Sequence, residues 1–292
     1  MAREIIPPGP LQLPYRAVTL YPSHTAVDVP QDAVLHWMAG NKAAQHEVYF
    51  SADQEAVANG TAPVTRLGKA QTSFDPGTLE RNKTYYWRVD EVNATATDGP
   101  WPGNVWSFTT ADFVMVEDFD SYNNTDNCIF DTWIDGVANK SSGSRVGYEN
   151  SPFAEWIVVQ SGSQSMPLAY DNTAAPFYSE AERQWTTARD WTVAGGDTLV
   201  LFIRGKSLNN ASQPLYVGLT DKAGKSAFAK SDPAILKAVT WTEWRIPLSQ
   251  FGVNAAAIKK MVIGVGNRDQ PTAGGTGLVY LDTIKVISSA GK

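Results

Sequence analysis

Short runs in which apolar and polar residues alternate dominate the chain. In TYYWRVDEVN (84–93) the residues Tyr85, Trp87 and Val89 recur at every second position, the period of a half-buried strand. Similar runs lie between clusters of Gly, Pro, Asn and Asp, and helical periodicity is confined to short segments at 232–239 and 253–261. The pattern predicts an all-β protein built from sandwiches or barrels.

The strand pattern changes its spacing near TTADF, around residue 112. We expect an extended, Pro-rich segment over 1–16, one domain over 17–111 and a second over 112–292. The second domain suits two stacked sheets, because eight or nine strand-like runs fall within about 180 residues. These runs are FVMVEDF, EWIVVQS, SMPLAYD, ERQWTT, DTLVLFIRGK, PLYVGLTDK, WTEWRIPL, KKMVIGVGN and GLVYLDTIKV.

The end of the first domain carries a recognisable pattern, LERNKTYYWRVDEVN followed by WPGNVWSFTT. It resembles the last strands of a fibronectin type III-like module. The resemblance covers residues 17–111 and implies a β-sandwich whose aromatic residues pack in the core. The resemblance implies no catalytic or binding residues in this domain and suggests that the domain is a spacer.

The second domain carries three ordered patterns: VEDFDSY (116–122), DWTVAGGDTLVLFIRGK leading to WTEWRIPLSQFG (190–252), and GLVYLDTIKV (277–286). Together they resemble calcium-containing carbohydrate-binding modules of the β-jelly-roll, galactose-binding-like type. The resemblance implies a jelly-roll sandwich, structural calcium and a polysaccharide partner. The tandem is similar to accessory regions of large secreted proteins of planctomycete-like marine bacteria, which implies an extracellular or cell-surface location.

The stretch VMVEDFDSYN (114–123) gathers three carboxylates, Glu117, Asp118 and Asp120, around Phe119. The first and last strands of a jelly roll commonly lie side by side, which would bring these carboxylates near Asp282. Calcium neutralises such a cluster with oxygen ligands, and alternation places Asp118 and Asp120 on one face. The resemblance thus implies Asp118, Asp120 and Asp282 as calcium ligands, although the family has Glu where Asp120 stands. A solvated acidic edge and a catalytic carboxylate pair are the alternatives.

Sugar recognition needs flat apolar rings and planar polar groups, and four loops combine them: 131–136, 146–156, 170–180 and 264–275. As exposed aromatic platforms we predict Trp133, Tyr148, Tyr170 and Tyr178. As hydrogen-bonding partners we predict Asp171, Asn172, Arg204, Asn267 and Arg268. Packing of the aromatic rings in the core and ordinary surface polarity are the alternative explanations.

Composition narrows the possible partners. Residues 1–111 hold 8 Lys or Arg against 11 Asp or Glu, and residues 112–292 hold 16 against 19, so each part contributes −3 to the net charge of −6. Without a basic stripe, nucleic acid is not expected as a partner, and strongly sulfated or uronate-rich polymers are disfavoured. The single Cys128 excludes an internal disulfide and a multi-thiolate zinc site.

Membrane insertion is not expected, because no run of about 18 apolar residues occurs. The start MAREIIPPGP lacks the apolar core of a signal peptide, so we expect export to depend on a leader that is not in this sequence.

Catalytic patterns are missing from the second domain. No histidine follows His46, and no G-x-S-x-G, H-E-x-x-H or Walker motif occurs. The sequence therefore predicts a non-catalytic, monomeric polysaccharide binder that can form part of a larger multidomain protein. The alternatives are an adhesive surface module that binds protein, and a glycoside hydrolase or polysaccharide lyase.

Overall fold

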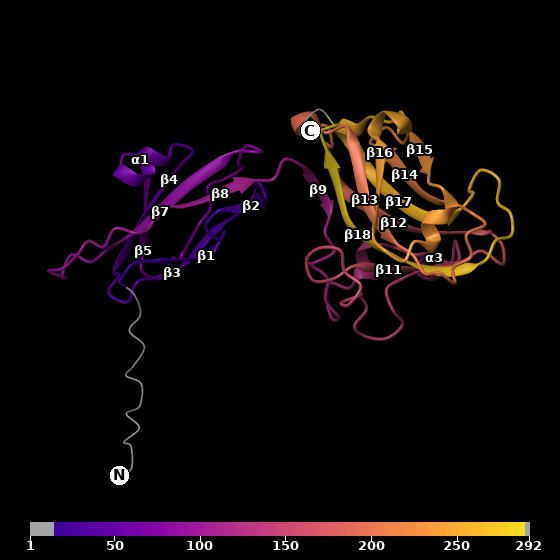
Figure 1. Cartoon of the computed structure of the whole chain (residues 1–292), viewed down its shortest axis with the longest axis horizontal. Helices are drawn as coiled ribbons and strands as arrows, with labels where there is room; N and C mark the ends of the chain where they lie inside the picture. Colours follow the sequence, from indigo (N-terminus) through magenta and orange to yellow (C-terminus); the bar gives the residue numbers. More distant parts are fainter. Residues whose placement is uncertain (1–14, 290–292) are drawn as a thin grey trace, which may run out of the picture. The chain divides into compact units, whose positions relative to one another are not determined.

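The computed structural model describes residues 15–289 (Figure 1). The extended segment predicted for residues 1–16 lies, except for its last two residues, outside the described part. The chain divides into two compact units, Met1–Asp112 and Phe113–Lys292. Strands form nearly all of the regular structure, so the all-β prediction is confirmed.

The first unit contains two sheets. The three-stranded sheet has the order β1 (Val18–Tyr21), β3 (Leu35–Met38) and β6 (Ser73–Phe74). The five-stranded sheet has the order β2 (Ala26–Val29), β8 (Trp106–Thr110), β7 (Thr84–Val92), β4 (Gln45–Ser51) and β5 (Val64–Gly68). A short helix, α1 (Gln54–Asn59), begins at the Asp53 carboxylate, which accepts from the N–H groups of Glu55 and Ala56.

Aromatic side chains fill the core of the first unit. Trp37 from β3 and Trp87 from β7 are fully buried, and their ring centroids lie 6.4 Å apart. Tyr85, Trp87 and Val89 all belong to this core, as their alternation in the sequence predicts. The sandwich is therefore held together by the aromatic residues that mark its strands.

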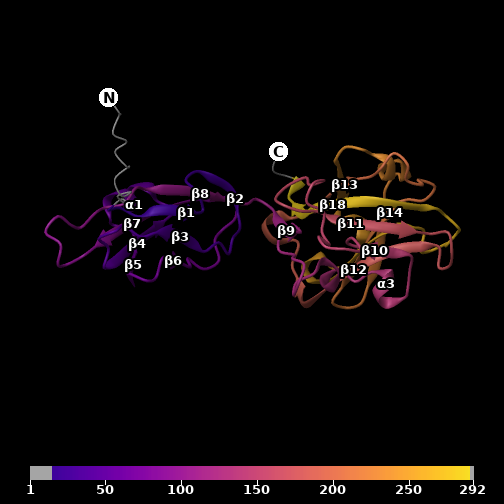
Figure 2. The same cartoon turned by 90° about the horizontal axis from the view of Figure 1, so that it is seen from below.

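The second unit also contains two sheets (Figures 1 and 2). A six-stranded sheet has the order β10 (Ser144–Val146), β11 (Met166–Asp171), β18 (Thr276–Ile287), β13 (Thr198–Arg204) and β16 (Thr242–Pro247), with β9 (Val114–Glu117) also paired to β18. A four-stranded sheet has the order β12 (Tyr178–Arg189), β17 (Ile258–Gly266), β14 (Leu215–Asp221) and β15 (Ser226–Lys230).

The connections of the second unit are those of a jelly roll. From β11 to β18 every connection crosses from one sheet to the other, except the hairpin between β14 and β15. The inner faces enclose one apolar core, to which β13 contributes Leu199, Leu201 and Ile203, and β18 contributes Val279 and Leu281. Helical structure is limited to single turns: α2 (Ile129–Thr132), α3 (Gly136–Asn139), η1 (Val193–Gly195), η2 (Pro233–Lys237), η3 (Leu248–Phe251) and η4 (Ala255–Ala257).

One predicted strand of the second unit is wrong. EWIVVQS, with its run of β-branched residues, forms a loop that meets a strand-like partner only at the bridge between Glu155 and Ser165. The Glu155 carboxylate accepts from the N–H groups of Ile157 and Val158, at 2.6 and 3.0 Å, and turns the chain away from the sheet. We call residues 155–164 the anchored loop.

Among the described residues, no helix is long and apolar enough to cross a membrane.

Candidate functional site

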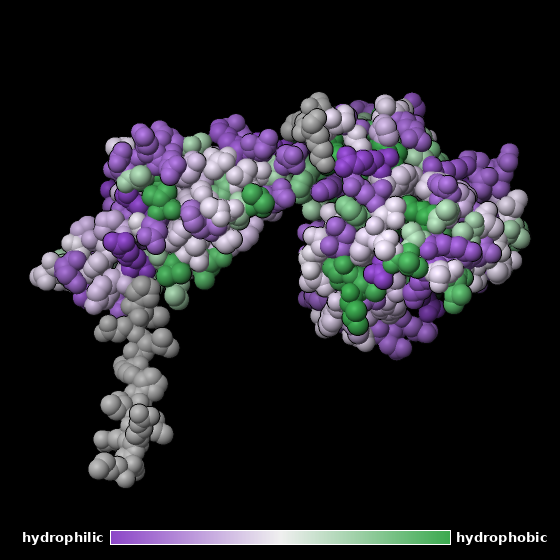
Figure 3. All heavy atoms as spheres, viewed as in Figure 1, coloured by the Kyte–Doolittle hydropathy of each residue, from purple (hydrophilic) through white to green (hydrophobic). Residues whose placement is uncertain are grey.

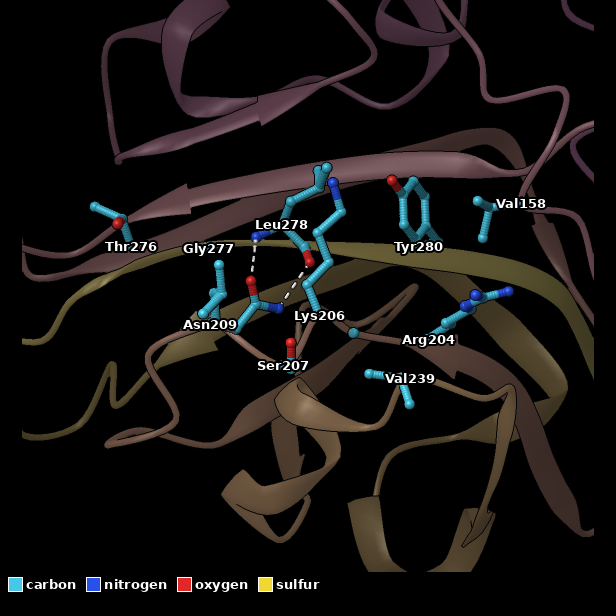
Figure 4. A pocket seen from close by; sticks show the side chains of 12 residues that line it. Val158, Arg204, Lys206, Ser207, Asn209, Val239, Thr276, Gly277, Leu278 and Tyr280 are labelled. Atoms are coloured by element: carbon cyan, nitrogen blue, oxygen red, sulfur yellow. Dashed lines mark hydrogen bonds between the residues drawn. The ribbon is translucent and has the colours of Figure 1, made fainter.

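A groove with a volume of about 570 Å³ lies over the outer face of the six-stranded sheet (Figure 4). Its floor comes from β18 and the end of β13, and its walls from the segment after β13, the anchored loop and the segment before β16. In Figure 4 the Tyr280 ring stands between Lys206 and Val158, with Arg204 beside it. None of the twelve residues that line the groove is Asp, Glu or His.

Strand alternation explains why Arg204 and Tyr280 face the groove. Ile203 and Leu281 point into the core, so their sequence neighbours Arg204 and Tyr280 point outward. Arg204 and Tyr280 are direct cross-strand partners, and Cβ atoms of such partners lie about 4.5–5.5 Å apart. A guanidinium and an aromatic ring are thereby fixed side by side on rigid strands.

The wall after β13 is held by Asn209, which is buried. Its side-chain amide donates to the carbonyl groups of Leu236 and Leu278, at 2.7 and 2.8 Å, and accepts from the N–H of Leu278 at 3.0 Å. A Cβ atom at Gly205 would lie 2.0 Å from the carbonyl oxygen of Leu236, so only glycine fits. This wall places the Lys206 ammonium 5.5 Å from the centre of the Tyr280 ring.

The anchored loop forms another wall through Val158. Burial alone would raise the pKa of Glu155, but hydrogen bonds from Tyr148 and from the backbone of Val158 and Ile157 lower it overall. The ionised Glu155 therefore holds the loop in place. Tyr148, which we predict as an exposed platform, is half-buried and donates its hydroxyl to this carboxylate.

A second hollow, of about 360 Å³, is lined by Trp156, Ser163 and Gln164 of the same loop and by Asp120 and Tyr122. Trp156 is 55% exposed, and its indole N–H donates to the Gln164 side chain at 2.9 Å. Such a partly covered ring, held by one hydrogen bond, suits stacking against a sugar. The sequence analysis missed Trp156 because it placed this residue in a strand. Its position at the end of the polar loop 146–156 was the available signal.

The acidic strand is mainly a structural feature. Glu117 is buried and accepts from the Tyr122 hydroxyl at 2.7 Å, the Trp133 indole at 3.1 Å and the Phe119 N–H at 2.9 Å. It also forms an ion pair with Arg183 of β12. Phe119 is fully buried, whereas Asp118 and Asp120 are exposed, as the alternation predicts.

The carboxylates of the three predicted calcium ligands all accept hydrogen bonds from the protein. Asp282 is fully buried and accepts from the N–H groups of Gln160 and Ser161, at 2.7 and 3.3 Å. Asp120 accepts from the Ser163 N–H at 2.7 Å, and Asp118 from the N–H of Asp120 at 3.1 Å.

Within residues 15–289 no group of three or more His, Cys, Asp or Glu side chains is placed to hold a metal. The arrangement shown does not fit the predicted set as one calcium site, and calcium binding stays a prediction. What Asp120 and Asp282 do in this structure is fix the anchored loop.

The predicted exposure of the Trp133 and Tyr170 rings is wrong, and Asn172, predicted as a hydrogen-bonding partner, is buried as well. Trp133 and Asn172 are 0% exposed and Tyr170 is 3% exposed. The ring centroids of Trp133 and Phe119 lie 6.0 Å apart. Burial raises the pKa of Tyr170 to about 12. Asn172 donates to the Gln213 side chain and the Val265 carbonyl, at 2.8 and 2.9 Å. These side chains hold the ends of the strands together and do not reach a ligand.

The other predicted binding residues are not gathered with Arg204. Tyr178, at the start of β12, lies under the Arg268 guanidinium, 5.4 Å away, and Arg268 is 3.5 Å from Glu180. Asn267 accepts from the Lys230 ammonium at 2.8 Å. Exposed Asp171 closes a local turn by accepting from Thr173. Of the predicted set, only Arg204 lines the groove.

Comparison with known proteins finds similarity in structure but not in sequence. No family matches its sequence, and no curated protein does. One similar structure is a carbohydrate-binding module from the β-sandwich superfamily, described as having promiscuous specificity. The alignment covers 96% of this chain and 100% of that chain, at 12% sequence identity and a TM-score of 0.39. The family 11 module of Clostridium thermocellum, in complex with a β-1,3-1,4-mixed-linked tetrasaccharide, covers 60% of this chain and 95% of its own, at 17% identity and a TM-score of 0.39.

An exo-β-agarase aligns with 60% of the chain through 25% of its own length, at 12% identity and a TM-score of 0.44. The structural neighbours are thus β-sandwich carbohydrate-binding modules together with some glycoside hydrolases, and at these scores they assign neither a family nor a ligand to this chain.

Proposed function

We propose that the second unit binds carbohydrate without cleaving it, in the groove over the six-stranded sheet. The observation that carries the proposal is the placement of the Arg204 and Lys206 side chains in an open groove, beside the Tyr280 ring of its floor, which is 5% exposed. An aromatic surface with hydrogen-bond donors around it is what a sugar ring and its hydroxyls require. The lack of a lining carboxylate speaks against a glycosidase pair at this place.

The remaining parts of the chain take supporting roles in this proposal. The first unit is a fibronectin type III-like spacer, and the protein works outside the cell or on its surface. The jelly-roll unit presents the groove, and Trp156 in the neighbouring hollow offers a further ring for stacking. A polysaccharide chain is the partner, bound by a monomer.

A protein-binding, adhesive module is the second candidate. Ile157 and Leu208 are 92% and 96% exposed, and a partner protein would bury their apolar side chains. On the face of the second unit seen in Figure 3, hydrophobic residues form separate patches among polar ones. Retention by a protein, with no retention by any glycan, would favour this candidate.

Blocking the groove tests the proposal. We expect Ser207→Trp to abolish retardation in affinity electrophoresis across a panel of polysaccharides, because an indole at this lining position occupies the groove. Ser207 is exposed, so the fold should survive. Ser249→Trp, at an exposed position in η3, is the matched control and should bind like the parent protein.

Trp156→Ala then shows how far the bound chain extends. A tenfold rise in Kd, about 1.4 kcal/mol, would place sugar on its ring. Binding by Ser207→Trp that equals binding by Ser249→Trp would rule out the groove.

The role of Asp282 separates calcium from hydrogen bonding. We expect Asp282→Ala to lower the free energy of unfolding by about 2–4 kcal/mol, because two backbone N–H groups of the anchored loop lose their acceptor. Urea denaturation with and without EDTA measures this, and Asp269→Ala, which removes an exposed surface pair, is the control. If calcium also binds, EDTA alone lowers the melting temperature of the parent protein, and added calcium restores it. An Asp282→Ala protein as stable as the control would contradict the anchoring role.

A further inference from the structure

The two cations of the groove have no direct salt-bridge partner among residues 15–289. Within the described residues, neither Arg204 nor Lys206 has a side-chain hydrogen bond or an ion pair, and Arg204 is half-buried. Four of the five other arginines of the same unit are paired, and Arg189 is the exception: Arg145, Arg183, Arg245 and Arg268 each lie within 4 Å of a glutamate oxygen. An arginine without an ion pair, such as Arg204, is therefore uncommon in this unit.

The acids that could neutralise these cations are already engaged. Asp282 lies one row further along the outer face of the sheet, where it is the register partner of Phe202, and it accepts from the anchored loop. Glu243, opposite Phe202 on β16, pairs with Arg245 at 2.6 Å. Glu155, whose charge is felt by Lys206, accepts from Tyr148 and two N–H groups. A half-buried guanidinium with unused donors is thus left for a ligand.

We propose that the groove selects acidic sugars, with a uronate carboxylate or a sulfate ester facing Arg204. This inference rests on the proposed carbohydrate binding and names its ligand class. The planar guanidinium fits two oxygens of such a group at once, and Lys206 adds a second positive charge over the edge of the site. Tyr280, the direct neighbour of Arg204, supplies the ring beside the same sugar.

The acidic net charge of the chain does not oppose this selection at close range. At physiological ionic strength charges are screened over about 8 Å, so the two cations that line the groove outweigh carboxylates elsewhere on the surface. The net charge of −6, spread evenly along the sequence, argues against acidic polymers only if the positions of the charges in the fold are ignored. The fold brings Arg204 and Lys206 together, apart from any lining carboxylate.

Matched polymers provide the test. The full-length protein is titrated with polygalacturonate and its methyl ester, and with a sulfated galactan and its desulfated form, by affinity electrophoresis and calorimetry. We expect at least one acidic polymer to bind tenfold more tightly than its neutral counterpart, with a preference that weakens as salt rises. A difference between polygalacturonate and its methyl ester would identify a carboxylate as the recognised group. A difference between the sulfated and the desulfated galactan would identify a sulfate ester.

Variants assign the preference to the groove. Arg204→Gln and Lys206→Gln should each reduce the ratio of acidic to neutral polymer binding at least fivefold, because the glutamine side chain can still donate hydrogen bonds but carries no charge. Arg189→Gln, which removes an exposed arginine at the end of β12, is the matched control and should keep the preference. Because Lys206 is exposed, Lys206→Gln should fold normally, and it tests the preference even if Arg204→Gln is unstable.

The outcomes separate the two proposals. Equal binding of acidic and neutral polymers, or a preference that survives both groove variants, would overturn the selection of acidic sugars while carbohydrate binding stands. Binding of no polymer by the parent protein would overturn carbohydrate binding and this inference with it.

Discussion

Replacing Glu117 with alanine should lower the free energy of unfolding of the second unit by about 3–5 kcal/mol, the range for breaking a buried ion pair by removing one partner. Glu117 is 6% exposed and joins β9 to Arg183 of β12, to the Trp133 indole and to the Tyr122 hydroxyl. Its removal leaves the Arg183 guanidinium and three further donors without their acceptor. No other residue of the acidic strand is connected to the core in this way.

Urea denaturation, followed by tryptophan fluorescence, measures this effect. Glu117→Gln, which keeps the size of the side chain and one acceptor oxygen, should fall between the parent protein and Glu117→Ala. The matched control is Asp118→Ala, since Asp118 is exposed and accepts one N–H, so its effect should stay within about 1 kcal/mol. Equal stability of Glu117→Ala and Asp118→Ala would show that the buried carboxylate does not hold the strand.

The second large effect is expected in the first unit, at the pair of His46 and Glu91. Both side chains are 0% exposed, with 2.5 Å between the imidazole Nδ1 and a Glu91 oxygen. The Nε2 atom lies 3.1 Å from the Lys69 carbonyl oxygen, which accepts only, so Nε2 donates; with the Glu91 carboxylate ionised, Nδ1 donates as well and the ring is charged. His46→Ala would leave the Glu91 carboxylate buried without its partner, at a cost of about 3–5 kcal/mol.

The same pair makes the stability of the first unit depend on pH. Burial acts to lower the pKa of His46, but hydrogen bonds to Glu91 and the Lys69 carbonyl, with the Glu91 charge, raise it above the ordinary value. Because the folded pKa is raised, the stabilisation is fully present below the unfolded pKa of about 6.5 and is lost as pH rises through the folded pKa.

Melting of the full-length protein between pH 5 and pH 9 measures this dependence. The parent protein should lose stability toward high pH, whereas His46→Gln should remove most of that slope. His36→Gln, at an exposed histidine of β3, should keep it. A parent protein whose first unit is equally stable at both ends of this range would contradict a charged His46.

Much of the fold follows from local patterns. Tyr85, Trp87 and Val89 lie on the buried side of β7, and the order of VEDFDSY, WTEWRIPL and VYLDTIKV corresponds to the jelly-roll strands β9, β16 and β18. Period-two alternation identifies strands because one face of each must pack on the core, whatever the partner strand is. Pairing β9 with β18, far apart in sequence, brings Glu117 opposite Ile284.

The candidate site was harder to predict, because exposure depends on distant contacts. Trp133 follows a short polar segment and looks exposed, yet its indole donates to Glu117, which precedes it by 16 residues. Trp156 lies in an apolar, β-branched run typical of a strand, but the Glu155 carboxylate bends that run into an exposed loop. Arg204 could be predicted, since it ends an apolar strand on the outward face. Its partner Tyr280 is identified only by the strand register.

The anchored loop is fixed by carboxylates that come from well-separated parts of the chain: Glu155 within it, Asp120 after β9 and Asp282 in β18. A wall built in this way has its bound shape before any ligand arrives, so little affinity is lost to ordering it, a cost of about 0.5–1.5 kcal/mol for each immobilised side chain. The arrangement also extends the set of positions that govern recognition. Under the proposed carbohydrate binding, a substitution at Asp282, fully covered by protein, would alter which sugars fit without touching one.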